Sequence, residues 1–206
     1  MDDVVNRSRS SIDVSRLPTV VFGRRSLMWW GTLGFMIIEG WTLGLTVMAY
    51  FYVRQNLESW PPLRTPRPSL LIPTINVAVM LISCIPAWCT ARRAKELDKR
   101  GVTLGLFISG AFGIAILVLR WFEFWAINTR WDTNVYGSVA WLIVGLQASL
   151  LLVDVADTIG LAVIFTKDDL PPHYYPDTCD NATYWYFTVL AWIPLYLIVY
   201  VSPYYI

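Results

Sequence analysis

The sequence predicts an all-α membrane protein, a bundle of five transmembrane helices, and three observations lead to this fold class. Of the 206 residues, 56% are hydrophobic and only 15% are charged, whereas roughly a quarter of the residues in a soluble domain are charged. Eleven Trp and eleven Tyr supply amphipathic rings, which gather where an apolar slab meets water. Five apolar runs are each long enough to cross a hydrocarbon layer of roughly 30 Å.

Each apolar run is expected to be one helix, because a helix pairs its backbone amides within its own segment. Residues 1–26 are expected to form a polar tail along the membrane surface, and residues 27–206 the transmembrane domain. Proline-rich segments separate the first run from the second and the fourth from the fifth, and a charged stretch separates the second from the third. In chain order the helices are expected at about 27–53, 73–91, 103–127, 136–165 and 184–205.

The basic residues predict the orientation, since cytoplasmic loops carry an excess of Lys and Arg. Eleven of the sixteen basic residues fall in the N-terminal tail, in the second connection and at Lys167 in the fourth connection. Four others, including Arg54 and Arg130, fall on the opposite side. The N-terminus is therefore predicted to be cytoplasmic and the C-terminus to be on the opposite, periplasmic side. The acidic fourth connection does not itself support this assignment.

The residue content argues against a metal or haem centre within this chain. There is one histidine, His173, and the three cysteines lie apart from one another, whereas haem and copper sites need clustered His, Cys or Met ligands. No nucleophile motif or phosphate-binding glycine loop is present. The net charge of +1 gives no field that would attract nucleic acid. We therefore expect no catalytic centre and no cofactor in this chain.

Charged side chains within the predicted spans are the candidate functional residues, because a carboxylate at bilayer depth is costly unless it is paired, protonated or hydrated. Glu39 lies in the first span and is either a proton or lipid site or a protonated, hydrogen-bonded structural group. Arg120 and Glu123 are one turn apart and are expected to form a structural ion pair near the outer interface. Asp154 and Asp157 share one face of the fourth helix and are expected to pair with a partner's basic residue or to face a water-filled crevice.

Five motifs in series resemble those of cytochrome c oxidase subunit III, and together they cover about residues 27–205. They are Trp29-Trp30-Gly31 through Glu39-Gly40 with Tyr50-Phe51-Tyr52 and Trp60-Pro61-Pro62; Asn76 and Ser83; Leu119, Glu123 and Phe124; Tyr136-Gly137-Ser138 with Gly145; and Tyr184-Trp185-Tyr186-Phe187 with Trp192.

Several positions depart from the family's pattern. Gln147 and Leu150 replace the family's paired histidines, Tyr186 replaces another histidine, and Arg120 replaces a glutamine. The first two helices of the seven-helix form are missing, as in five-helix members. Since those helices form one arm of a lipid-holding cleft, a lipid site of that kind is not expected to be complete, and a bound phospholipid stays an open alternative.

The resemblance implies a divergent, non-redox subunit III of a haem-copper terminal oxidase in the bacterial inner membrane. Such a subunit packs on subunit I, which carries the haems and copper, contacts other oxidase subunits and membrane lipids, stabilises the complex and supports proton uptake. By position, Glu39 matches the buried carboxylate of the family's third helix and Glu123 matches a conserved acidic residue of the family, so both are candidates for a proton or lipid site. Two alternatives remain: a subunit-III-like accessory or assembly protein of a nitric oxide reductase, or an independent proton or solute carrier.

Overall fold

The computed structural model describes residues 20–205, and the five expected helices are present. Each helix is long and apolar enough to cross a membrane, and no strand occurs in this part of the chain. The all-α, five-helix prediction is therefore confirmed, and the chain is a multi-pass membrane protein. The helices are α1 (Leu27–Gln55), α2 (Leu71–Lys95), α3 (Lys99–Ala126), α4 (Val135–Phe165) and α5 (Tyr174–Tyr196), followed by a π-helical turn (Leu197–Val201) and a 3-10 turn (Ser202–Tyr204).

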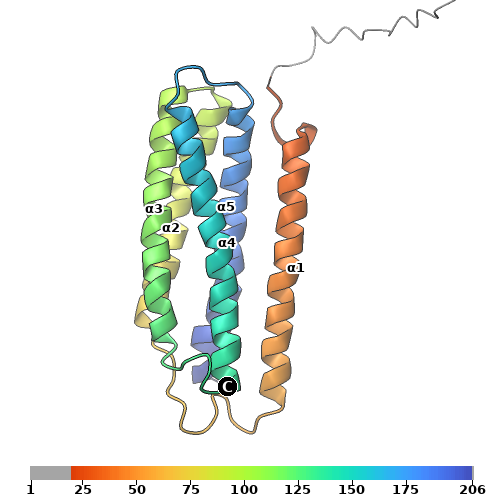
Figure 1. The fold of residues 1–206 in the computed structure, drawn as a ribbon, viewed down its shortest axis with the longest axis vertical. Helices are drawn as coiled ribbons and strands as arrows, with labels where there is room; N and C mark the ends of the chain where they lie inside the picture. The colour runs from red at the N-terminus through yellow and green to blue at the C-terminus, as the bar shows by residue number, and fades with distance from the viewer. Residues whose placement is uncertain (1–19, 206) are drawn as a thin grey trace, which may run out of the picture.

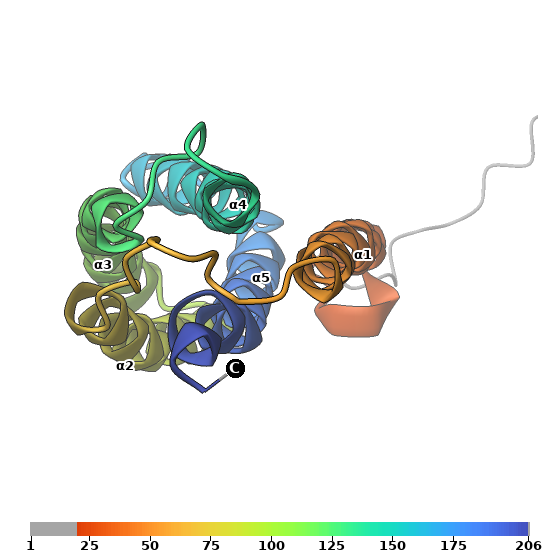
Figure 2. The same cartoon turned by 90° about the horizontal axis from the view of Figure 1, so that it is seen from below.

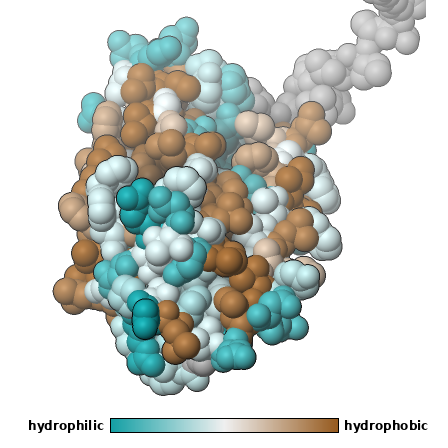
Figure 3. Space-filling model, turned by 60° about the horizontal axis from the view of Figure 1, so that its bottom comes forward, coloured by the Kyte–Doolittle hydropathy of each residue, from teal (hydrophilic) through white to brown (hydrophobic). Residues whose placement is uncertain are grey.

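Helices α2 to α5 form a four-helix ring, and α1 stands beside it next to α4 and α5 (Figures 1 and 2). Only three residues of α1 are buried, Glu39, Leu43 and Tyr50, and they fall on one narrow stripe of the helix. Apolar side chains such as Ile37 and Trp41 point outwards and are exposed. Hydrophobic residues also spread over the face of the bundle shown in Figure 3, where hydrophilic residues form separate groups. Lipid or another protein must therefore cover these apolar faces.

Helix α5 begins at Tyr174 rather than at residue 184, so the predicted start of the fifth span is wrong. Pro176 lies in the first turn of α5, where the backbone N–H groups have no intrahelical partner and a proline is tolerated. The prolines that suggested a long loop therefore belong partly to the helix. The residues that follow Tyr174 face the bundle, with Thr178 and Asp180 both buried.

The charged connection between α2 and α3 is also shorter than expected, because α2 continues to Lys95 and α3 begins at Lys99. The Asp98 side chain caps α3 by accepting a hydrogen bond from the Gly101 N–H (3.1 Å), and Arg93 donates to its other oxygen (2.9 Å). The Gly101 N–H first, and the Arg93 guanidinium next, hold the pKa of Asp98 below its usual value.

Two glycines of α3 allow close approach of neighbouring helices. A Cβ atom on Gly105 would lie 2.1 Å from Oγ1 of Thr90 in α2, and one on Gly113 would lie 2.6 Å from Cγ2 of Val155 in α4. Small residues are typical where membrane helices touch, since no hydrophobic effect drives helices together inside lipid. These contacts explain how α3 packs tightly against helices on both sides.

The connection between α1 and α2 runs across the lower end of the bundle (Figure 2). Within it, the Trp60 indole N–H donates to the Tyr50 hydroxyl (2.6 Å), and the Trp60 ring packs edge-on against Tyr136 of α4. The Tyr50 hydroxyl also lies 3.1 Å from the Ser202 hydroxyl oxygen beyond α5. Two of the sequence motifs therefore meet at this end and fix the lower part of α1.

Candidate functional site

Glu39 faces the four-helix ring from the middle of α1 and is only 6% exposed. The Tyr184 hydroxyl of α5 donates a hydrogen bond to Glu39 Oε2 (2.6 Å). The Tyr184 ring also packs against Phe35, one turn before Glu39, with ring centroids 5.8 Å apart. A buried Tyr usually needs a partner for its hydroxyl, and here the partner is a carboxyl group. This bond ties α1 to α5 within the apolar part of the bundle.

Arg120 and Glu123 form the expected salt bridge, which is fully enclosed by the bundle within the last two turns of α3. Arg120 Nη1 donates to Glu123 Oε2, and the side-chain amide of Asn76 in α2 donates to the other oxygen, Oε1 (2.9 Å). The Tyr200 hydroxyl, from the π-helical turn, donates to the backbone carbonyl of Glu123 (3.0 Å). Both carboxylate oxygens are therefore satisfied, as a buried charge requires.

The Arg120 guanidinium also lies over the face of the Trp192 ring, with Cζ 3.7 Å from the ring centroid. Its Nη2 group lies 3.6 Å from the Met80 sulfur. A cation above an aromatic face is attracted by the negative charge density of the ring. The Arg120 cluster therefore joins α2, α3 and α5 through directional contacts, which fixes their relative register.

The Ser83 hydroxyl of α2 accepts a hydrogen bond from the Trp185 indole N–H of α5 (2.9 Å). Asn76 and Ser83, the small polar positions of one motif, are therefore partners of Glu123 and Trp185, which belong to two others. Motifs that are far apart in the sequence are thus joined by hydrogen bonds between helices.

Asp154 and Asp157 lie on one face of α4, as expected, and both approach Asn181 of α5. The Asn181 side-chain amide donates to Asp157 Oδ2 (2.9 Å) and more weakly to Asp154 Oδ1 (3.5 Å). Asn181 also exchanges hydrogen bonds with Thr158. Within residues 20–205, no Lys, Arg or His forms a salt bridge with either aspartate. The expected pairing was with a basic residue of a partner, and it stays a prediction.

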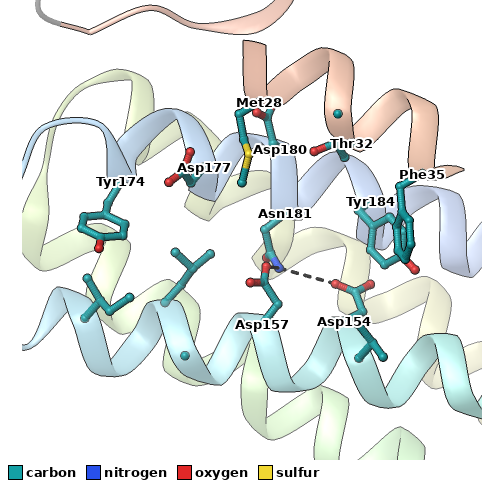
Figure 4. Close-up of a pocket in the computed structure, with 15 residues that line it drawn as sticks. Met28, Thr32, Phe35, Asp154, Asp157, Tyr174, Asp177, Asp180, Asn181 and Tyr184 are labelled. Carbon is teal, nitrogen blue, oxygen red and sulfur yellow. Dashed lines mark hydrogen bonds between the residues drawn. The ribbon is translucent and has the colours of Figure 1, made fainter. Parts of the chain in front are cut away.

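These aspartates line a cavity of about 630 Å³ between α1, α4 and α5 (Figure 4). Asp177 and Asp180 of α5 line the same cavity, and the rest of its wall is mainly apolar. Tyr184 belongs to this wall as well, so the cavity reaches the residue that binds Glu39. The arrangement places several carboxyl groups along an apolar groove that opens beside α1.

Sequence reasoning missed Asn181 and the role of Tyr184. The sequence predicts that Asn181 lies in the connection before residue 184, whereas in the structure it belongs to α5 and lies opposite Asp157. The sequence places Tyr184 in a motif, but it does not show that the Tyr184 hydroxyl, which needs a hydrogen-bond partner within a span, donates to Glu39. In the part of the chain that the structure describes, no group of three or more His, Cys, Asp or Glu side chains is placed to bind a metal ion.

Comparison with known proteins finds similar proteins that share one name. No family model matches the chain. Cytochrome c oxidase subunit 3 of Synechocystis sp. is 24% identical over 185 residues, which cover 86% of this chain and 77% of that protein. The protein of the same name from Thermostichus vulcanus is 25% identical over 175 residues, covering 83% and 85%. The horse protein is 23% identical over 142 residues, covering 68% of this chain and 54% of its own length.

Proposed function

Since the comparisons support a divergent member of the cytochrome c oxidase subunit III family, we propose that the chain is the non-redox subunit III of a haem-copper terminal oxidase. It packs on subunit I in a bacterial inner membrane, stabilises that subunit and supports proton uptake during oxygen reduction. The haems and copper that reduce oxygen belong to subunit I. The observation that carries the proposal is the similarity over more than four fifths of the chain to two proteins with this name.

The outward faces of the helices favour a role within a larger membrane complex. Large apolar side chains are exposed on every helix, and aromatic residues are prominent among them, including Trp41, Trp88, Trp121 and Trp125. Exposed Trp residues are enriched at protein interfaces and at membrane surfaces. The relatives' shared name favours an oxygen-reducing complex over the nitric oxide reductase alternative.

The proposed orientation places the N-terminus in the cytoplasm. The α2–α3 connection then faces the cytoplasm with its basic residues, as the positive-inside rule requires. The groove beside α1 opens towards the same end, because the start of α1, the end of α4 and the start of α5 lie together there (Figure 1). A carboxyl-lined groove at the cytoplasmic end is consistent with a role in proton supply.

Co-purification tests this proposal directly. The tagged chain is purified from its native membrane in mild detergent, and a haem spectrum of the eluate is recorded together with the identity of the largest co-purifying subunit. We expect reduced-haem absorption bands and a subunit I of the oxygen-reducing type. A haem-free monomer, or a nitric oxide reductase core, would overturn the proposal.

The role of Glu39 in proton uptake is tested within the assembled oxidase. We expect Glu39→Gln to leave the subunit content unchanged, because Gln still accepts the Tyr184 hydrogen bond, and to lower turnover or hasten inactivation. Glu39→Leu removes the acceptor and should also loosen α1 from the complex. If Glu39→Gln has normal turnover and normal inactivation, Glu39 is a structural hydrogen-bonding group only.

A further inference from the structure

The interior of the ring formed by α2 to α5 contains polar atoms that the described chain leaves without a hydrogen-bond partner. Two of them are donors, Arg120 Nε and the Trp192 indole N–H, and two are acceptors, Asn76 Oδ1 and Gln147 Oε1. All four side chains are at most 1% exposed, and each comes from a different helix of the ring. A buried polar atom without a partner is costly, so these atoms mark a place where a further group belongs.

The four side chains lie at one level of the bundle. Arg120 and Asn76 donate to the two oxygens of the same carboxylate, that of Glu123. The Arg120 guanidinium lies over the Trp192 ring, with Cζ 3.7 Å from the ring centroid. Gln147 donates weakly to a backbone carbonyl of α5 that lies one turn before Trp192 (3.5 Å). The unpartnered donors and acceptors therefore belong to one cluster, which surrounds the Arg120–Glu123 ion pair.

The orientation of the two side-chain amides is fixed by these contacts. The Asn76 nitrogen must face the Glu123 carboxylate, which only accepts, and the Gln147 nitrogen must face a backbone carbonyl. Exchanging oxygen and nitrogen in either amide would place two acceptors against each other. Turning the amide groups over therefore does not supply the missing partners, and Asn76 Oδ1 and Gln147 Oε1 still need donors.

The group that satisfies these atoms must be small, neutral and able both to donate and to accept hydrogen bonds. None of the four atoms is accessible from outside the bundle, which excludes a bulky ligand. Arg120 and Glu123 already neutralise each other, so no further ion is needed. Water has these properties, and a buried water typically makes about three hydrogen bonds to polar groups that lack protein partners.

A small groove on the outside of α3 and α4 lets water approach Arg120. Arg120 lines this groove together with the exposed side chains of Trp121 and Leu152. The groove has a volume of about 240 Å³, whereas one water molecule needs roughly 10–15 Å³ of accessible space. Arg120 lies about 9 Å along α3 from the last residue of the helix, Ala126. The groove is therefore close to the end of the bundle, where water meets the membrane.

We propose that bound water occupies the interior of the ring at this level, where it accepts hydrogen bonds from Arg120 Nε and the Trp192 indole and donates to Asn76 Oδ1 and Gln147 Oε1. This water hydrates the Arg120–Glu123 ion pair within the apolar bundle, and it connects α4 to a cluster that is otherwise built from α2, α3 and α5. The site is independent of the proposed oxidase role, because it rests on the side chains of this chain alone.

Radiolytic labelling of the full chain in oxygen-18 water tests the site, because X-ray pulses convert a bound water into a hydroxyl radical that oxidises the side chains next to it. Helix α5 offers a matched pair of residues. Trp192 and Trp185 are both buried, at 0% and 4% exposure, but the Trp185 indole already donates to the Ser83 hydroxyl (2.9 Å). We expect peptide mass spectrometry to find oxygen-18 on Trp192, while Trp185 stays at the background level.

Removal of one acceptor tests whether the labelling comes from the proposed water. Gln147→Leu keeps a similar side-chain size without Oε1 and should abolish most of the labelling of Trp192. Thr42→Val removes a hydroxyl from the exposed side of α1 and should change nothing. Equal labelling of Trp192 and Trp185 in the unmodified chain would overturn the proposal, as would a Trp192 signal that Gln147→Leu leaves unchanged or that Thr42→Val lowers equally. If Gln147→Leu does not fold, the two Trp residues of the unmodified chain still decide.

Discussion

Replacing Gly113 by Ala tests whether the α3–α4 contact sets the packing of the bundle. The new Cβ would lie 2.6 Å from Val155 Cγ2, about 1 Å closer than two carbon atoms at their optimal separation. Val155 cannot easily rotate away, because a β-branched side chain in a helix has one strongly preferred rotamer. Overpacking of this kind costs about 1–3 kcal/mol.

The matched control is Gly145→Ala in α4, where no heavy atom lies within 4 Å of the new Cβ. Both variants gain about 1 kcal/mol of helix propensity. The difference between their free energies of unfolding therefore gives the packing cost of Gly113→Ala alone. We expect Gly113→Ala to be about 1–3 kcal/mol less stable than Gly145→Ala, measured by reversible unfolding in mixed micelles. In the double variant Gly113→Ala with Val155→Ala, the loss of unfolding free energy should be at least about 0.5 kcal/mol smaller than the sum of the losses in the two single variants.

Equal stability of Gly113→Ala and Gly145→Ala would refute this reasoning, since it would mean that α3 and α4 can separate at no cost. An additive double variant would show that the strain of Gly113→Ala does not arise at Val155.

Three further outcomes follow from the polar contacts. Glu123→Leu should cost about 3–5 kcal/mol, because it leaves a buried Arg120 unpaired, and adding Arg120→Leu should recover much of this loss in the same unfolding assay. Tyr184→Phe should lower the stability by about 1–3 kcal/mol, because the hydrogen bond to Glu39 is lost. Faster proteolysis of the intact protein between α1 and α2 would show that α1 is held less firmly. Asp98→Asn should lower the melting temperature at neutral pH. The folded pKa of Asp98 is below its unfolded value, so its stabilisation is complete above the unfolded pKa and is lost as the pH falls through the folded pKa. The difference from the unmodified chain should therefore shrink as the pH falls below the ordinary Asp pKa of about 3.9, and a difference that does not change with pH would contradict the electrostatic explanation.

The number of helices and their order could be predicted from the sequence, because each span is a run of apolar residues long enough for the bilayer. The helix ends were less predictable. The residues of α5 from Tyr174 to Thr183 suggest a loop in the sequence, because Asp177 and Asp180 are hydrophilic. Their burial against other helices, and not their own propensity, places them in a helix.

The candidate residues could be found as charges in apolar surroundings, but their partners could not. Arg120 and Glu123 are one turn apart, so their contact follows from helical geometry. Asn76, which completes the pair, is on a different helix, and only the register of α2 against α3 brings it within reach. The groove around Asp154 likewise depends on how α1 stands beside the ring, which no local pattern encodes.

The unequal attachment of α1 has a consequence for how this helix moves. Its lower end is anchored by Trp60 and Tyr50, while its upper half is held to α5 by the Glu39–Tyr184 hydrogen bond and the Phe35–Tyr184 ring contact. A tilt of α1 about its lower end would therefore move its first turns the most and would change the width of the cavity beside Met28 and Phe35. Loss of the Tyr184–Glu39 hydrogen bond would make such a tilt of α1 easier.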